Sequence, residues 1–460
     1  MAIISEREFA VKDEPMALVY LQCGRHALLR NEFEIAMENF ERCYNARITR
    51  KLSVLLLNQM ANCMGQLEYY DRQQGYLEDL CELDLSFENV RQLMNIYLAT
   101  NNEVKRSAFA EKIRRLTAKD KSEERSAIFL LSQAKDHNEV LQRSLEWLKE
   151  NPQDVDVARA VINVYMEMER IEDAFVFIRQ LDAEFFKDKL LLELSALHRK
   201  MFDAEGGHDF LMRHMELYKE NVMGVNRLAF TLITNTCYDG LLTGDDYVHW
   251  MWRAWESTKP QVALNVNFDN DTNYFRKIRV GIISYDFRMH SVGKFIMSLF
   301  DTVPTDTQIE TYCYYTHPEH TDDYTEVIKS QADVFKHVGK YSDKQLRKEL
   351  LSDRLDILVD LNGQTAGSRL GLVAERFAPV QATWMGFPFS SFHYNVDYNI
   401  GDYFFDPVDG ETERYCTEKI LRMDPSYMCF ALGMDYYINP EPPQVKNQYV
   451  TFGMMNNPQK

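Results

Sequence analysis

Residues 277–295, KIRVGIISYDFRMHSVGKF, decide the fold of the second half of the chain. Val280, Ile282 and Ile283 make this stretch apolar and rich in β-branched residues, and a polar segment and a helix-like segment follow them. Such a run is typical of a strand that is buried on both faces of a sheet. The stretch therefore predicts a buried strand, a loop and a helix in direct succession.

The sequence beyond this stretch repeats the same alternation. Short buried strands that alternate with helices indicate a parallel, doubly wound sheet. We therefore predict a Rossmann-like doubly wound α/β lobe over residues 277–448. Its further apolar runs lie at 309–315, 356–361, 380–386 and 396–400, and its helix-like segments include 342–352 and 368–377.

The sequence before this lobe has a helical pattern. Up to about residue 230 it is poor in glycine and proline, and its apolar residues follow a helical period. In the segment 17–43, small and large residues occur at the spacing of a tetratricopeptide repeat. The small residues let two antiparallel helices approach closely, and the large ones fill the groove between them. The residues at these positions are Tyr20, Gly24, Ala27, Phe33, Ala36 and Phe40.

Later segments repeat this pattern irregularly. Residues 56–80 match it with Gln73 in place of a small residue, and residues 151–181 match it clearly, with Ala174 at the position of Ala36. Ala36 and Ala174 lie 138 positions apart, which is close to four periods of about 34 residues. We predict a tetratricopeptide-like α-solenoid over residues 1–235 and a helical connector and linker over 236–276. The alternative is a plain helical bundle without a binding groove.

Charge and composition exclude several classes of function. The 460 residues carry 52 Lys and Arg against 70 Asp and Glu, a net charge of −18. This sign opposes binding to a phosphate backbone, so we expect no nucleic acid and no membrane among the partners. The eight cysteines form no CxxC pair, the first residues lack the apolar run of a signal peptide, and no apolar stretch approaches the ~18 residues of a membrane span. We therefore expect a cytoplasmic protein.

The first candidates for chemistry follow the first predicted strand. Ligands bind open α/β sheets beyond the carboxyl ends of the strands. Asp286 and His290 lie there, and a carboxylate with an imidazole at this spacing suits proton transfer. Taken alone, the pair is weak evidence, because a lone histidine on a loop is more often a surface or capping residue.

Two turns after later strands are candidates for binding a substrate. The polar turn after 356–361 suits an anionic or sugar group, and a tight turn follows 380–386. Neither has the spacing of a GxGxxG or a GxxxxGK[ST] motif, so no NAD or ATP cofactor and no metal is predicted. The residues of these turns are Asn362, Gly363, Thr365, Gly367, Gly386 and Pro388.

Four segments of the predicted lobe together resemble one known family. They are RVGIISYDFRMHSVGKF at 279–295, ILVDLNGQTAGSR at 357–369, FAPVQATWMGFP at 377–388 and VDYNIGDYFFDPVD at 396–409. Over residues 277–455 their order and spacing resemble the first catalytic lobe of the O-GlcNAc transferase family. That family also carries N-terminal tetratricopeptide repeats.

The resemblance implies a two-lobed GT-B type glycosyltransferase. Such an enzyme moves a sugar from UDP-GlcNAc to Ser or Thr of proteins, with inversion and without a metal or other cofactor, while the helical repeats hold the acceptor protein. Asp286 and His290 match the family's SxDFxxH segment, and either is a candidate for the base. Gly386 and Pro388 match the GxP turn at the donor sugar. The turn with Asn362, Gly363, Thr365 and Gly367 matches the family's NGxTxG segment.

The chain departs from the family's pattern near the expected donor site. Phe389, Ser390 and Ser391 stand where the family has glycine, threonine and serine, and Val292 stands where a hydroxyl-bearing residue is frequent. These differences leave the sugar preference open. A nucleotide hexose and GDP-fucose are compatible donors besides UDP-GlcNAc, because the residues that select the nucleotide are expected beyond Lys460.

The last residues lead to an expectation about completeness. Residues 449–460, YVTFGMMNNPQK, resemble the opening strand of the family's second lobe, which makes most contacts with the nucleotide. The 460 residues alone are therefore expected to bind a donor poorly and to turn over little. The alternative to an enzyme is a non-catalytic tetratricopeptide adaptor, or one half of a heteromeric transferase.

Overall fold

The computed structural model describes most of the chain. The described residues are 14–46, 48–100, 102–217, 232–233, 235–236, 239–258, 268–273, 275–302, 308–318, 320–365, 367–387, 389–408, 410–430 and 439–453. They form two compact units. The first contains the described residues up to Ala183 together with 317–318 and 337–352, and the second contains the remaining described residues.

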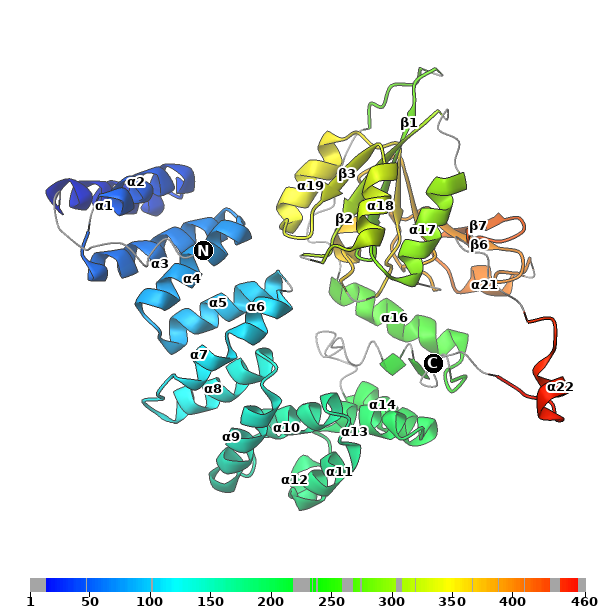
Figure 1. Ribbon diagram of the computed structural model, residues 1–460, viewed down its shortest axis with the longest axis horizontal. Coiled ribbons are helices and arrows are strands. Elements are labelled where there is room, and N and C mark those ends of the chain that lie inside the picture. Colours follow the sequence, from blue (N-terminus) through cyan, green and yellow to red (C-terminus); the bar gives the residue numbers. More distant parts are fainter. Residues whose placement is uncertain are drawn as a thin grey trace. The chain divides into compact units, whose positions relative to one another are not determined.

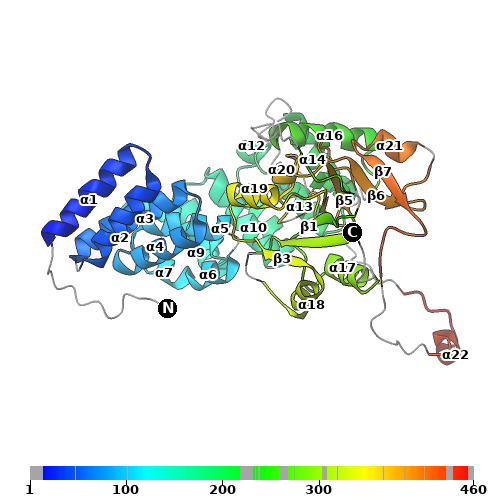
Figure 2. The ribbon, with the colours of Figure 1, turned by 90° about the horizontal axis from the view of Figure 1, so that it is seen from above.

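The first unit consists mainly of helices that follow one another as packed pairs (Figure 1). Figure 2 shows the same succession from above. This arrangement confirms the predicted tetratricopeptide-like solenoid. The helices are α1 (Glu14–Leu29), α2 (Phe33–Asn45), α3 (Arg50–Gln66), α4 (Tyr70–Leu83), α5 (Phe87–Ala99), α6 (Glu103–Ala108), α7 (Ala110–Arg114), α8 (Lys121–Gln133), α9 (His137–Glu150), α10 (Val155–Glu167) and α11 (Ile171–Gln180).

Close approach within the first pair depends on Gly24. A Cβ atom added at Gly24 in α1 would lie 2.4 Å from Cε1 of Phe40 in α2, and Phe40 is fully buried. In the next pair the small residue stands on the opposite helix, because a Cβ atom at Gly65 in α3 would lie 2.7 Å from Nε2 of Gln73 in α4. The irregular match at Gln73 is therefore compensated by a glycine across the interface.

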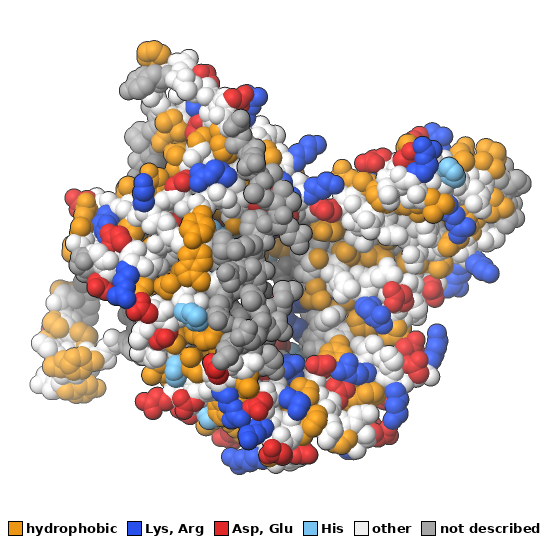
Figure 3. Space-filling view, turned by 180° about the vertical axis from the view of Figure 1, so that it is seen from behind, with side chains coloured by type: hydrophobic (Ala, Val, Ile, Leu, Met, Phe, Trp, Pro, Cys, Tyr) orange, Lys and Arg blue, Asp and Glu red, His pale blue; other side chains and the backbone are white. Residues whose placement is uncertain are grey.

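Charged side chains of both signs are interspersed over these helices (Figure 3). Ion pairs between neighbouring helices contribute to this mixture, for example Arg125 to Asp154 at 2.7 Å and Lys121 to Glu150 at 2.8 Å. Exposed pairs of this kind add little to stability. Packing of the apolar face holds the array together, and the charges keep its surface hydrated.

We predict opposite effects of two glycine substitutions on the repeats. Gly24→Ala is expected to lower the free energy of unfolding by about 1–3 kcal/mol, because the new methyl group collides with the ring of Phe40. Gly75→Ala in α4 is the matched control, because Gly75 is exposed and its Cβ position has no neighbour within 4 Å. It is expected to raise stability by about 0.5–1 kcal/mol through helix propensity. Urea unfolding followed by circular dichroism measures both, and equal shifts would contradict the packing argument.

The second unit contains a parallel sheet, as predicted for the α/β lobe. Within the described residues seven strands form one sheet in the order β3-β2-β1-β4-β5-β6-β7. The pairs β1/β2, β1/β4, β4/β5, β5/β6 and β6/β7 are all parallel. The strands are β1 (Ile278–Ser284), β2 (Ile309–Tyr315), β3 (Val334–His337), β4 (Ile357–Asp360), β5 (Val380–Trp384), β6 (Tyr398–Asp402) and β7 (Lys419–Met423).

The edge strands β3 and β7 were not predicted, because charged residues such as Lys336 and Arg422 interrupt their apolar pattern. Their apolar content is too low for the pattern of a buried strand. The five predicted strands lie between them in the order of the sheet. Short and charged edges are a usual way to prevent a sheet from pairing with another chain.

Helices cover the sheet, and a buried cluster joins the two layers. Val292 and Ile296 of α17 and Ile328 of α18 pack with residues of β1, β2 and β4. The helices after β1 in the second unit are α17 (Ser291–Thr302), α18 (Asp323–Gln331), α20 (Leu370–Val373), α21 (Glu411–Arg414) and α22 (Pro443–Asn447), and α19 (Asp343–Ser352) belongs to the first unit.

The predicted helical segment 368–377 forms only the single turn α20, and a buried glutamine accounts for the difference. Gln381 of β5 donates from Nε2 to the carbonyl oxygens of Val373 and Glu375, both at 3.1 Å, and accepts from the N–H of Phe377 at 2.8 Å. These bonds satisfy backbone groups that a longer helix would pair internally. A tertiary contact therefore ends the helix early.

The helices that precede the sheet in sequence belong to the second unit. They are α13 (Leu191–Lys200), α14 (Ala204–Leu217) and α16 (Gly244–Thr258), and α12 (Ala183–Phe186) stands before them. Leu192, Leu211 and Trp250 share one buried cluster with Phe392, which follows β5. No described helix is both long enough and apolar enough to cross a membrane. The boundaries at residues 235, 276 and 448 stay predictions.

Asp356 anchors the start of β4. Its carboxylate accepts two hydrogen bonds from Arg276 at 2.6 Å, one from the N–H of Arg279 at 2.8 Å and one from Nδ2 of Asn270 at 2.5 Å. Burial by itself would raise the pKa of Asp356, but the bonds from Arg276, Arg279 and Asn270 lower it to about 2. The anchor lies at the amino ends of β1 and β4, away from the ends where ligands are expected.

This anchor predicts a pH dependence of stability. The folded pKa of Asp356 lies below its ordinary value, so its contribution of about 2 kcal/mol is present above pH 4 and is lost as the pH falls from about 4 to about 2. Asp356→Asn is expected to be less stable than the parent chain at pH 7, and the difference is expected to shrink towards pH 2.5. Urea unfolding at both pH values tests this, and a difference that does not change with pH would contradict it.

Candidate functional site

The order of the strands places a crevice between β1 and β4. The chain leaves β1 towards β2 and β3 on one side and returns to β4 on the other side. At such a switch point the loops after the two central strands diverge, and ligands bind there in doubly wound sheets. The predicted residues Asp286 and His290 follow β1, and Asn362 follows β4. The topology therefore brings two of the predicted segments to one place.

Asn362 joins these two loops. Its Oδ1 accepts from the backbone N–H of Tyr285 at 2.7 Å, and its Nδ2 donates to Oδ2 of Asp286 at 3.3 Å. The N–H of Tyr285 can only donate, so it fixes which end of the Asn362 amide faces Asp286. The Asn362 side chain is almost completely buried, which protects both bonds from competing water.

The carboxylate of Asp286 is buried and engaged at both oxygens. Asp286 is 6% exposed. Oδ1 accepts from the guanidinium of Arg288 at 3.1 Å, and Oδ2 accepts from Asn362. The backbone N–H of Asp286 donates to Oγ of Ser284 at the end of β1. Arg288 supplies a nearby positive charge that the sequence analysis did not single out.

His290 lies at the surface of this cluster. Its side chain is 42% exposed, and its Nδ1 lies 3.6 Å from Oδ2 of Asp286. Nδ1 also accepts from the backbone N–H of Val292 at 3.3 Å. A neutral ring that accepts at Nδ1 carries its proton on Nε2, whereas a proton on Nδ1 would point to Asp286 and leave Nε2 as a base. Val292 and Asp286 therefore favour opposite tautomers of His290.

Asp360 shapes the turn after β4, and sequence reasoning missed it. Its carboxylate accepts from the backbone N–H of Gly363 at 2.7 Å and from that of Asn362 at 3.3 Å. Burial raises the pKa of Asp360 to about 7, and these two backbone bonds offset only part of the effect. The signal in the sequence was an acidic residue at the end of an apolar strand, ILVD, where a buried parallel strand is expected to stay apolar.

The predicted turn residues adopt conformations that require glycine. Gly363 and Gly367 have φ values of +52° and +79°, and added Cβ atoms would collide with Phe387 and with the ring of Tyr285. The hydroxyl of Thr365 donates to the carbonyl oxygen of Asn362 at 2.8 Å and closes the turn. All three lie in the loop after β4, beside the cluster around Asp286.

Gly386 packs directly on the backbone of this turn. A Cβ atom added at Gly386 would lie 1.5 Å from the carbonyl oxygen of Leu361. The turn after β5 therefore touches the turn after β4 with no room for a side chain. Pro388, the other predicted residue of this turn, lies outside the described residues.

A helix start fixes the backbone of the loop that carries His290. Asp322 and Thr325 form a capping box at the beginning of α18. Asp322 Oδ2 accepts from the N–H of Met289 at 2.7 Å, and the hydroxyl of Thr325 donates to the carbonyl oxygen of Phe287 at 2.7 Å. Sequence reasoning missed both residues, although D-x-x-T before a helical segment is a capping signal.

Two of the residues that depart from the family's pattern, Ser390 and Ser391, are held by a buried glutamate. The hydroxyl of Ser390 donates to Oε2 of Glu418 at 2.6 Å, and the backbone N–H of Ser391 donates to Oε1 of Glu418 at 2.7 Å. Glu418 is 5% exposed and stands just before β7. The two serines therefore fix the course of the chain after Gly386, and no pattern at 390–391 alone could show this.

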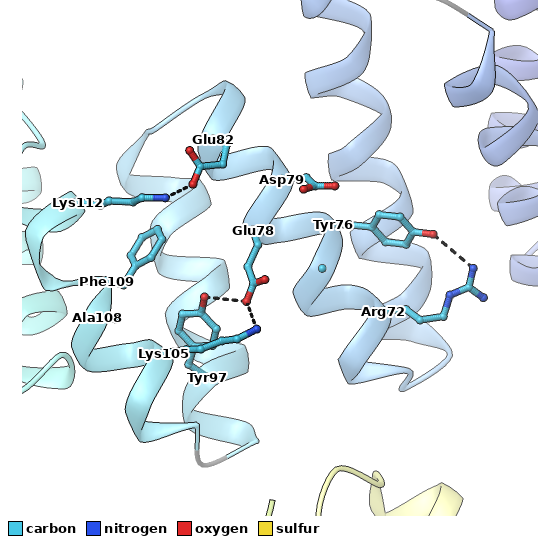
Figure 4. Close-up of a pocket in the computed structure, with 11 residues that line it drawn as sticks. Arg72, Tyr76, Glu78, Asp79, Glu82, Tyr97, Lys105, Ala108, Phe109 and Lys112 are labelled. Carbon is cyan, nitrogen blue, oxygen red and sulfur yellow. Dashed lines mark hydrogen bonds and ion pairs between the residues drawn. The ribbon is translucent and has the colours of Figure 1, made fainter. Parts of the chain in front are cut away.

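A cavity of about 660 Å³ lies in the helical repeats (Figure 4). Its lining combines aromatic rings with charged groups that pair across it. Lys105 donates to Oε1 of Glu78 at 2.9 Å, the hydroxyl of Tyr97 donates to the same atom at 3.0 Å, and Lys112 pairs with Glu82. Figure 4 shows these side chains reaching from α4, α5, α6 and α7 towards one another.

Within the described ranges, no group of three or more His, Cys, Asp or Glu side chains is placed to hold a metal ion. The cluster around Asp286 instead offers hydrogen-bond donors and acceptors, one carboxylate and one imidazole. Such a set can orient a hydroxyl group, accept its proton and bind a polar ligand such as a sugar.

Part of the chain is similar to a known family of enzymes. Residues 260–433 match the model of glycosyl transferase family 41. The chain resembles the O-GlcNAc transferase family. The matched residues span the strands β1 to β7 and every described residue of the cluster, so the resemblance covers the part of the chain in which the candidate site lies.

Curated relatives match between a third and a half of this chain. The SPINDLY protein of Arabidopsis thaliana, named "Probable UDP-N-acetylglucosamine peptide N-acetylglucosaminyltransferase", is 31% identical over 236 residues, which are 51% of this chain and 25% of that protein. The SEC protein of the same plant is 29% identical over 153 residues, which are 33% of this chain and 15% of that protein. The matched segments thus span about a quarter or less of the length of these relatives.

A solved structure has the same fold over most of the chain. A mutant of the Thermobaculum terrenum O-GlcNAc transferase superposes with a TM-score of 0.51 and 20% identity, over 72% of this chain and 58% of that chain. At this identity the likeness concerns the fold. It is consistent with helical repeats followed by a doubly wound α/β lobe in one chain.

The contact between the two turns predicts a sharp effect of Gly386→Ala. The added methyl group collides with backbone atoms of Leu361, which cannot rotate away, so the substitution is expected to lower the free energy of unfolding by about 2–4 kcal/mol. Gly371→Ala is the control, because the Cβ position of Gly371 has no neighbour within 4 Å. Thermal unfolding followed by tryptophan fluorescence compares the two, and similar melting temperatures would contradict the close contact.

Proposed function

We propose that this chain supplies the helical repeats and the first catalytic lobe of an enzyme that transfers a sugar from a nucleotide donor to Ser or Thr hydroxyls of proteins. The observation that carries the proposal is the cluster of Asp286, His290 and Asn362 at the switch point between β1 and β4. The match of residues 260–433 to glycosyl transferase family 41 supports the same reaction class. The names of the plant relatives support GlcNAc as the sugar and UDP as the nucleotide.

The proposed reaction needs a base near the acceptor hydroxyl. The acceptor oxygen attacks the anomeric carbon, the bond from that carbon to the diphosphate breaks, and the hydroxyl proton passes to the base. His290 suits this role better than Asp286, because its ring is exposed while both oxygens of Asp286 already accept hydrogen bonds. A bound acceptor that draws the ring proton to Nδ1, next to Asp286, leaves Nε2 free to take the hydroxyl proton.

The turns after β4 and β5 are proposed to bind the sugar. Gly363, Gly367 and Gly386 let these loops pack closely on Phe387, Tyr285 and Leu361, and this packing fixes the backbone groups that we propose to face the sugar. Thr365 is exposed beside them and offers a hydroxyl group. Pro388 belongs to the same proposal by its sequence position. We propose that most contacts with the nucleotide come from a second lobe, and that transfer needs neither a metal nor another cofactor.

The helical repeats are proposed to hold the acceptor protein. The cavity lined by Tyr97, Phe109 and paired charged residues is of a size that side chains of an extended polypeptide fill. Ion pairs such as Glu78 to Lys105 can exchange partners with charged groups of that polypeptide. We propose a cytoplasmic location, since the described cysteines are free thiols and disulfides are rare in that compartment.

Transfer of radiolabelled GlcNAc tests the proposal. The protein is expressed from its complete natural gene, and label from UDP-GlcNAc is followed into protein of the lysate. His290→Ala is expected to lower incorporation by a factor of about 10²–10⁴, the usual effect of losing a general base. His26→Ala, which removes an exposed histidine of α1, is the matched control and is expected to leave incorporation unchanged.

Two outcomes would contradict the proposal. Equal incorporation with His290→Ala would remove His290 from the chemistry. No incorporation from UDP-GlcNAc, a nucleotide hexose or GDP-fucose would favour the non-catalytic adaptor, in which the repeats bind a partner and the α/β lobe is only a folded support.

A further inference from the structure

A second pocket lies in the α/β unit, apart from the cluster around Asp286. Its volume is about 300 Å³, and α16, α21 and the segments after β5 and β6 line it. Figures 1 and 2 both show α16 and α21 side by side, and an ion pair from Arg414 to Asp245 joins the two helices at 2.8 Å. The pocket shares no residue with the cluster formed by Asp286, His290 and Asn362.

Aromatic rings form much of the wall of this pocket. Tyr247 of α16 packs on Phe389 with ring centroids 4.7 Å apart. Phe405 follows β6, and Tyr415 follows α21 and packs against Gly244, where an added Cβ would lie 2.5 Å from its ring. Electron-rich ring faces attract cations, and several rings around one space hold alkylated ammonium groups well.

The pocket also contains a buried carboxylate without a partner. Asp406 lines it and is only 5% exposed. Over the described ranges of the chain, no hydrogen bond and no ion pair reaches the Asp406 side chain. Its carboxylate lies over Gly401, where an added Cβ would sit 1.9 Å from Oδ2. A glycine therefore makes room for a charged group that the fold itself leaves unpaired.

The nearest cation does not neutralise Asp406. Arg422 donates to the backbone carbonyl oxygens of Asp406 and Pro407 and pairs with Glu413. Burial raises the pKa of Asp406, and the charge of Arg422 offsets only part of that effect. An unpaired buried carboxylate is costly for the fold, and its usual compensation is a cation held in contact with it.

We propose that the pocket between α16 and α21 binds an organic cation, an ammonium group on a short aliphatic chain, with Asp406 as its counter-ion and the rings of Tyr247, Phe389, Phe405 and Tyr415 around it. The volume suits a ligand of a few heavy atoms or the end of a lysine side chain. Asn399 and Ser390 offer further polar atoms at the wall. This site goes beyond the proposed sugar transfer, and it meets the segment after Gly386 through Phe389.

Binding of butylammonium tests the proposal directly. Ligand-observed NMR titrations of the intact chain use butylammonium chloride at constant ionic strength, and butan-1-ol serves as the neutral ligand of similar shape. We expect saturable binding of butylammonium at least tenfold tighter than that of butan-1-ol. Asp406→Asn is expected to weaken the binding of butylammonium at least tenfold, because it removes the charge and keeps the shape.

Two further variants distinguish binding in the pocket from general effects of charge and of folding on the measured affinity. Asp424→Asn removes an exposed carboxylate outside the pocket and is expected to leave the affinity unchanged. Tyr415→Leu keeps the carboxylate and removes one ring, and it is expected to weaken binding several-fold. This second variant keeps the proposal testable if Asp406→Asn fails to fold.

A competition experiment shows whether the cation is a lysine side chain of a polypeptide or a small molecule. A blocked Gly-Lys-Gly peptide that displaces butylammonium assigns the pocket to a lysine of a polypeptide, and a peptide without effect assigns it to a small molecule. Equal affinity for butan-1-ol, or unchanged binding of butylammonium by Asp406→Asn, would overturn the proposal. Because no nucleotide sugar is present, these results are independent of whether sugar transfer is observed.

Discussion

The side chain of Asn362 is the constraint on which the candidate site depends. The loops after β1 and β4 diverge at the switch point of the sheet, and no strand pairing holds them together there. Asn362 accepts from the backbone of one loop and donates to the carboxylate of Asp286 in the same loop, while its own backbone belongs to the other. The bond to Asp286 is buried and the bond from Tyr285 is partly buried, and together they fix the position of Asp286. Asp286 then lies 3.6 Å from Nδ1 of His290, whose loop is also held by Asp322 and Thr325.

Carboxylates organise the α/β unit at the ends of its strands. Asp356 ties the start of β4 to Arg276, Asp360 holds the turn after β4, and Asp322 caps α18 while it holds the loop of His290. Each accepts backbone N–H groups that the sheet or helix leaves unpaired. Asp406 breaks this rule, since it is buried and no protein donor among the described residues reaches its carboxylate. That contrast is the reason to connect Asp406 with a ligand and the other three with the fold.

The helical repeats show how the same packing geometry tolerates an irregular sequence. In the first pair a glycine of α1 faces the ring of Phe40, and in the second pair a glycine of α3 faces Gln73. The sum of the two facing volumes is what matters for the distance between the helices. A repeat pattern that judges each position by itself therefore finds a poor match at Gln73. The two helices still pack closely, because Gly65 on the facing helix leaves room for the larger side chain.

The sequence by itself determined the succession of helical repeats and an α/β lobe, the five central strands and the two predicted segments that meet at the switch point, because hydrophobic periodicity and turn residues act locally along the chain. Only the tertiary structure decided that the predicted helix at 368–377 stops after one turn, that Asn362 contacts Asp286, and that Asp322, Asp360 and Glu418 support the site. Each of these features rests on hydrogen bonds of one side chain, some to groups in the same turn, as at Asp360, and others to groups far along the chain, as between Asp322 and Met289. Which donor reaches which carboxylate depends on distances that no pattern along the chain contains, and for that reason an unpaired Asp406 could be recognised only in three dimensions.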